Sequence, residues 1–107
     1  MPKYLVQVAY TPESCAAMVK NPQNRLEAVR PAVESLGGKF DDAWFAFGAY
    51  DLVGICDFPD NPSAAAFSLS VAARGSVKDL HTTPLMTMAE SVEAMKKASA
   101  SAYEPPK

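Results

Sequence analysis

Two strand-like segments separated by a very short connection constrain this fold more than any other feature of the sequence. Residues 39–47 are rich in aromatic side chains and residues 51–58 in aliphatic ones, and Gly48-Ala49-Tyr50-Asp51 connects the two. A connection this short joins only antiparallel neighbours, because a parallel crossover needs about a dozen or more residues. The two segments therefore predict a β-hairpin.

The elements predicted on either side of the hairpin follow one pattern. A strand over Lys3–Tyr10 precedes a helix that begins at Thr11-Pro12, breaks at Asn21-Pro22 and then resumes. An alanine-rich helix over Ser63–Arg74 precedes a strand over Ser76–Thr87. This order predicts an α+β fold of the ferredoxin-like split βαβ type, with a four-stranded antiparallel sheet and its helices on one face.

The C-terminal part adds one element to this pattern. Residues 88–102 predict an extra helix with Val92 and Met95 facing inward, and residues 103–107 predict an extended tail. Pro84 lies inside the preceding strand, where a proline requires an edge position or a bulge. We therefore expect one domain over residues 1–102, followed by the tail.

Apolar side chains lie on both faces of the first predicted strand. Tyr4, Val6 and Val8 alternate with Leu5 and Ala9. An antiparallel sheet that is covered on one face only is usually polar on the other. This pattern predicts a homodimer formed through the sheet, with Trp44 among the residues that it needs.

Composition and charge exclude several classes of protein. The net charge is −2 and the sequence pI is about 5.3, whereas a general nucleic-acid-binding protein needs a basic surface. No apolar run approaches the roughly 18 residues of a membrane span, and no leader pattern precedes the first strand. Cys15 and Cys56 are far apart and are interpreted as free, buried thiols. We expect a cytoplasmic protein that binds neither nucleic acid nor membrane.

The hairpin residues carry a resemblance to a known family. The run from Phe47 to Val53, Phe-Gly-Ala-Tyr-Asp-Leu-Val, resembles the Gly-x-Tyr-Asp segment of the bacterial GYD-domain family. The segments 24–28, 36–39 and 82–87, and the tail 103–106, also look familial, so the resemblance covers essentially the whole chain. It implies a dimeric α/β barrel in which two ferredoxin-like sheets pack face to face. It implies no catalytic motif, and a fold does not supply a function.

His81 is the only histidine and the first candidate for chemistry. Asp79 and Thr83 fall on the same face of its predicted strand. A histidine oriented by a carboxylate can act as a general base, so His81 and Asp79 form the predicted catalytic pair. The alternative is a histidine that is merely solvated at a strand edge.

A second set of candidates surrounds the hairpin. Tyr10, Trp44, Tyr50 and Asp51 are the predicted ligand-binding residues, because aromatic rings near a carboxylate suit a small apolar or aromatic molecule. The alternative assigns the aromatic rings to the core and dimer interface, and assigns Asp51, Tyr50 and Gly48 to turn geometry.

Other residue types give weaker signals. Lys20 and Arg25 flank the helix break and could hold an anionic ligand, or be solvated helix charges. One histidine and two distant cysteines predict no metal site, and no motif predicts a cofactor. No base or cation lies near Cys56 in the sequence, so we do not expect it to be a nucleophile.

Two functions remain open at this level. The first is a small-molecule-binding protein or cofactor-independent enzyme, with a pocket beside the sheet of a homodimer or higher oligomer. The second is a non-enzymatic stress or assembly protein whose sheet serves only oligomerisation. A pocket would favour the first, and a sheet packed solid by aromatic residues would favour the second.

Overall fold

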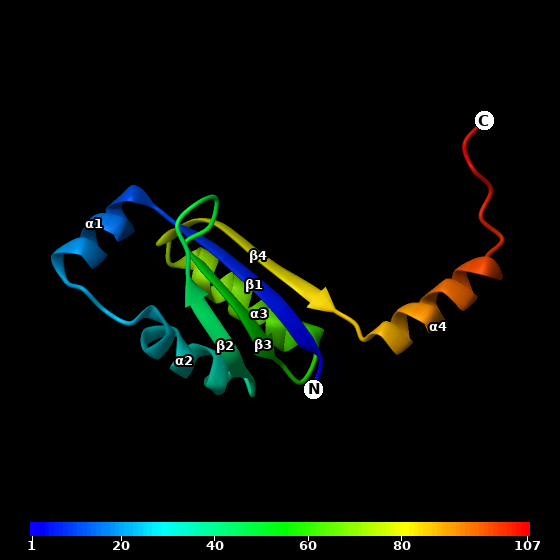
Figure 1. Cartoon of the computed structure of the whole chain (residues 1–107), viewed down its shortest axis with the longest axis horizontal. Helices are drawn as coiled ribbons and strands as arrows, with labels where there is room; N and C mark the ends of the chain where they lie inside the picture. The colour runs from blue at the N-terminus through cyan, green and yellow to red at the C-terminus, as the bar shows by residue number, and fades with distance from the viewer.

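The structure, a computed structural model, describes residues 1–107 and confirms the ferredoxin-like arrangement (Figure 1). One four-stranded sheet has the order β2-β3-β1-β4, and all three neighbouring pairs are antiparallel. The elements in chain order are β1 (Lys3–Tyr10), α1 (Pro12–Lys20), α2 (Arg25–Ser35), β2 (Lys39–Phe45), β3 (Leu52–Asp57), α3 (Asn61–Ala73), β4 (Val77–Leu85) and α4 (Met88–Ser99). Since β4 pairs only with β1, Pro84 lies on an edge strand, where its missing N–H is tolerated.

Local side-chain chemistry explains where the helices begin and end. Thr11, Asn24 and Asp60 each cap a helix by accepting a backbone N–H bond with the side chain. The bond from Ser63 lowers the pKa of the Asp60 carboxyl. Gly75 follows α3 with φ +73°, a left-handed conformation that glycine adopts without strain.

The main core lies between the sheet and helices α2 and α3. The register of β1 directs Tyr4, Val6, Val8 and Tyr10 to this side, and each is at most 6% exposed. They pack in one cluster that includes Phe67 of α3. This packing fixes the two helices on one face of the sheet.

The opposite face of the sheet is not covered by any helix. Leu5 and Gln7 face this side, and their cross-strand partners include Ile55 and Val53 of β3. These four side chains are half-buried rather than fully exposed, since they shield one another on a flat strand surface. We call this surface the open face.

The C-terminal helix differs from its prediction. Val92 and Met95, expected to face inward, are 49% and 67% exposed, and no residue of α4 is buried. Figure 1 shows α4 projecting away from the sheet beyond the end of β4. The apolar stripe of α4 therefore stays exposed, because the helix projects away from the sheet and packs on neither of its faces. No helix of the chain is both long and apolar enough to cross a membrane.

The two cysteines have different environments. Cys56 is fully buried, and burial, followed by the nearby charges of Asp41 and Asp57, raises the pKa of its thiol to about 12. Cys15 was expected to be buried but is exposed, because α1 packs lightly and buries no residue. Cys56 is therefore a core residue with an inert thiol.

An ion cluster holds three strands together at the sheet end opposite the hairpin. The Lys3 ammonium bonds to the Asp41 carboxylate of β2 and, at 2.9 Å, to the Asp57 carboxylate of β3. The bond to Asp41 raises the pKa of Lys3, and the same bond lowers the pKa of Asp41. Lys3 and Asp41 are solvent-exposed, so their pairing contributes little to stability. Asp57 is buried, and the Lys3 ammonium gives its carboxylate a hydrogen-bond partner.

Candidate functional site

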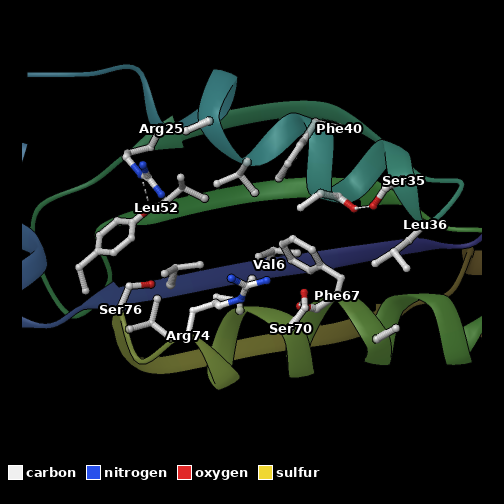
Figure 2. A pocket seen from close by; sticks show the side chains of 18 residues that line it. Val6, Arg25, Ser35, Leu36, Phe40, Leu52, Phe67, Ser70, Arg74 and Ser76 are labelled. Carbon is white, nitrogen blue, oxygen red and sulfur yellow. Dashed lines mark hydrogen bonds between the residues drawn. The ribbon is translucent and has the colours of Figure 1, made fainter.

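A groove lies between α2, α3 and the helix-facing side of the sheet. It has a volume of about 600 Å³, and 13 of its 18 lining residues are hydrophobic. Figure 2 shows α2 and α3 on either side of the groove, with strands beneath. The lining residues are Val6, Val8, Tyr10, Arg25, Ala28, Val29, Ala32, Ser35, Leu36, Phe40, Leu52, Ala66, Phe67, Ser70, Val71, Arg74, Ser76 and Val77.

The groove exists because alanine occurs where α2 and α3 face each other. Ala28 and Ala32 line it from α2, and Ala66 lines it from α3. The larger inward residues, such as Val33 and Phe67, are fully buried and set the height of both helices above the sheet. A methyl side chain cannot fill the remaining space, so a volume within the ordinary range for small-molecule sites remains.

Both guanidinium groups of the groove lie toward one end, and the rest of the lining is mainly apolar apart from Ser35 and Ser70. The helices run in opposite directions, so the first residue of α2, Arg25, and the residue that ends α3, Arg74, lie toward the same end. Tyr10 and Ser76 add hydroxyl groups there. Figure 2 shows Leu36 toward the opposite end.

Arg25 is held by neutral partners. Its Nε donates to the Tyr10 hydroxyl at 3.5 Å, its guanidinium lies 5.7 Å from the centre of the Tyr10 ring, and its Nη1 donates to Gln23 Oε1 at 2.6 Å. Arg74 makes no side-chain hydrogen bond or salt bridge. Neither guanidinium is paired with a carboxylate, and the lining contains no acidic residue. The groove is therefore a positively charged hollow.

The four predicted ligand residues do not line one cavity, although Tyr10 and Asp51 are joined by a hydrogen bond. Tyr10 is 5% exposed and lines the groove. Trp44 does not line the groove, is 56% exposed, and borders a second hollow of about 320 Å³, which shares Arg25 and Leu52 with the groove. Phe45 and Phe47 are also exposed, so among the aromatic residues of segment 39–47 only Phe40 lies in the core of the single chain.

Asp51 fastens the hairpin to the end of β1. Its carboxylate accepts the Tyr10 N–H at 2.8 Å, and its own N–H donates to the Val8 carbonyl at 2.7 Å. Gly48 does not have the left-handed φ expected for it, and a Cβ there would meet open space. The Tyr-Asp part of the motif therefore has a structural role, whereas the backbone does not require glycine at 48.

The predicted catalytic pair lies on the open face, away from the groove. His81 Nε2 is 3.2 Å from Asp79 Oδ2, and both side chains are about half exposed. The Tyr50 ring packs edge-on against the His81 ring, with centroids 5.6 Å apart. His81 is paired with Gln7 in the register, which places this cluster on the uncovered side of the sheet.

Sequence reasoning missed most of the groove. Arg74 looked like an ordinary charge at a helix end, and the alanines looked like helix-forming residues. The available signal was the small size of the side chains on the inner faces of both helices. Small side chains indicate a cavity only when the distance between the two helices is known. That distance depends on packing between residues far apart in the sequence.

The chain matches the GYD domain over residues 4–95. It is 29% identical over 80 residues to the glutamine synthetase and cystathionine beta-lyase binding protein of Thermus thermophilus, a match that covers 75% of this chain and 84% of the relative.

Two solved structures are similar in fold. The crystal structure of FFRP-DM1 matches with a TM-score of 0.55 and 13% identity, over 80% of this chain and 100% of the other. The hypothetical protein PHS023 from Pyrococcus horikoshii matches with a TM-score of 0.52 and 15% identity, over 81% of this chain and 92% of the other. At these identities the likeness concerns the fold alone.

Asp51→Ala is expected to destabilise the protein by about 1–3 kcal/mol, because the partly buried Tyr10 N–H loses its acceptor. Denaturant unfolding monitored by circular dichroism measures the change. Asp51→Asn is the matched control, since the amide oxygen can still accept this bond. Equal stability of the alanine variant and the wild type would show that the carboxylate does not anchor the hairpin.

Proposed function

This chain belongs to the GYD-domain family, and from that premise we propose that it is a small-molecule-binding protein whose ligand occupies the groove between α2 and α3. The observation that carries the proposal is the groove itself, with its volume of about 600 Å³ and mainly apolar lining. Pockets of this size and character bind small organic molecules. The lining offers hydroxyl and guanidinium donors but no histidine, cysteine or carboxylate, which favours binding over acid–base chemistry.

We further propose that the protein acts as a homodimer formed through the open face. Leu5, Val53 and Ile55 give this face an apolar centre, and Trp44 stands opposite Val53 at its edge. Covering such a surface gains roughly 25 cal/mol per Å² of apolar area. Because the groove lies on the other side of the sheet, this dimer would leave the groove accessible.

Dimerisation would also change the surroundings of His81, the residue on which the alternative function of catalysis depends. In the single chain, both side chains of the His81–Asp79 pair are about half exposed, and the hollow of about 350 Å³ that borders Asp79 is not lined by His81. A second open face would enclose the pair together with Tyr50. An enzyme of this kind would lose activity when the dimer is broken, whereas groove binding would not depend on the dimer.

Association with metabolic enzymes is a second candidate function. The Thermus relative is named for binding glutamine synthetase and cystathionine beta-lyase. In this chain, α4 presents Met88, Val92 and Met95 at helical spacing on its surface, and these residues are 83%, 49% and 67% exposed. An apolar stripe on a projecting helix suits a protein partner.

Ala28→Trp is expected to block the groove, because an indole at this exposed lining position would occupy its volume. The uncharged fluorescent probe N-phenylnaphthylamine should brighten on binding to the wild type. We expect the variant to bind it about tenfold more weakly or worse, a difference of about 1.4 kcal/mol. Ala73→Trp, on an exposed part of α3 outside the groove, is the matched control. Equal binding by both variants would contradict the groove as the site.

Trp44→Asp is expected to shift the dimer toward monomer, since it places a charge in the proposed interface. Sedimentation equilibrium at micromolar concentration measures the association. Val19→Asp, which replaces an 81% exposed apolar residue on α1, should leave the association unchanged. A monomeric wild type at the same concentration would refute the dimer.

Purified glutamine synthetase and cystathionine beta-lyase from the organism of this chain are expected to co-sediment with it if the second candidate function is correct. Met95→Asp should weaken each complex by interrupting the apolar stripe of α4. Glu93→Asp, on the same helix, keeps its charge and is the control. Co-sedimentation that Met95→Asp leaves intact would exclude α4 as the contact, and no co-sedimentation would exclude this function.

A further inference from the structure

The charge of the groove indicates which class of apolar ligand it binds. Two guanidinium groups face a hollow whose remaining lining is uncharged. The chain as a whole carries a net charge of −2, so this local excess of two positive charges opposes the overall balance. Within a partly enclosed apolar groove, such charges attract an anion more strongly than they would on an open surface.

Helix stability does not explain the position of Arg25. It is the first residue of α2, where the helix dipole favours acidic side chains and disfavours cations. Arg30, on the same helix, pairs with Glu27 at 3.4 Å, whereas Arg25 has no acidic partner. Its contacts with Tyr10 and Gln23 orient the guanidinium without neutralising it.

Arg74 complements Arg25 across the groove. Its place at the C-terminal end of α3 is ordinary for a cation, so its position alone indicates nothing. Its side chain, however, is unpaired, and Figure 2 shows it directed over the groove from the side opposite Arg25. An anion between the two would receive donors from both helices.

The form of the groove limits the kind of anion. The apolar part that extends toward Leu36 and Phe40 needs an apolar body on the ligand. The lining contains no glycine, and thus none of the glycine-rich backbone that commonly cradles phosphates. Paired arginines suit a carboxylate, which accepts bonds from guanidinium groups in a matching planar geometry.

We propose that the groove binds an amphipathic carboxylic acid, with its carboxylate between Arg25 and Arg74 and its apolar chain or ring extending along the groove toward Leu36. This inference rests on the proposed binding function and specifies the class of ligand. The two arginines would recognise the carboxylate of the acid, and the inward-facing alanines would leave space for its apolar chain or ring.

Displacement of N-phenylnaphthylamine by four compounds with a decyl-length chain tests whether the groove prefers a negatively charged ligand. Decanoate should displace the probe from the wild type at least tenfold more effectively than decanol or decyltrimethylammonium, because charge-assisted hydrogen bonds between a guanidinium and a carboxylate are stronger than neutral ones. Arg25→Gln and Arg74→Gln should each remove most of this preference while leaving decanol unchanged. Arg30→Gln, a matched change of charge on α2 outside the groove, should retain it.

The fourth compound is decyl phosphate. Each of the following outcomes would overturn a defined part of the proposal. Equal displacement by decanoate and decanol, or an undiminished decanoate preference in both groove variants, would refute anion recognition while leaving an apolar binding groove. A clear preference for decyl phosphate over decanoate would refute the carboxylate. If the probe binds the Ala28→Trp variant as well as the wild type, the groove function itself fails, and the inference fails with it.

Discussion

The burial of one face of β1 beneath two helices is the constraint on which the rest of the structure depends. As a central strand, β1 pairs with both β3 and β4, so its register sets the sheet. Its even-numbered side chains, from Tyr4 to Tyr10, are almost completely buried against α2 and α3. This packing places both helices on one side and thereby separates a covered face, which contains the groove, from an open face.

The groove follows from unequal side-chain size within that packing. Large residues such as Val33 and Phe67 hold the helices at a fixed height, and the alanines between them leave space that nothing in the chain fills. Two uncompensated arginines at one end make that space positively charged. A protein core is normally closely packed, so an unfilled, charged hollow of this size supports the binding role that we propose.

The family motif stabilises a different part of the molecule, namely the hairpin and the open face. Asp51 ties the hairpin to the backbone at the end of β1, while Tyr50 crosses the open face to contact His81. The motif therefore organises the open face, and the groove occupies the other side of the same sheet. If the proposed dimer forms, the two faces have separate tasks, with self-association on one and ligand binding on the other.

The sequence by itself determined the local order of this protein. The short hairpin connection, the start of α1 at Thr11-Pro12 and the alternation in β1 depend on neighbours in the chain, and all three were predicted. It also placed Asp79 and His81 together, because residues two apart on a strand share a face. The inward orientation of α4 was predicted wrongly, because an amphipathic stripe does not say whether its partner surface belongs to the same chain. The groove, the convergence of Arg25 with Arg74 and the separation of Tyr10 from Trp44 were decided only by the tertiary structure. The first two depend on how far two helices stand apart after packing on a common strand, and that distance is set by side chains remote from one another in the sequence. The third depends on the strand register, which places Tyr10 and Trp44 on opposite faces of the sheet.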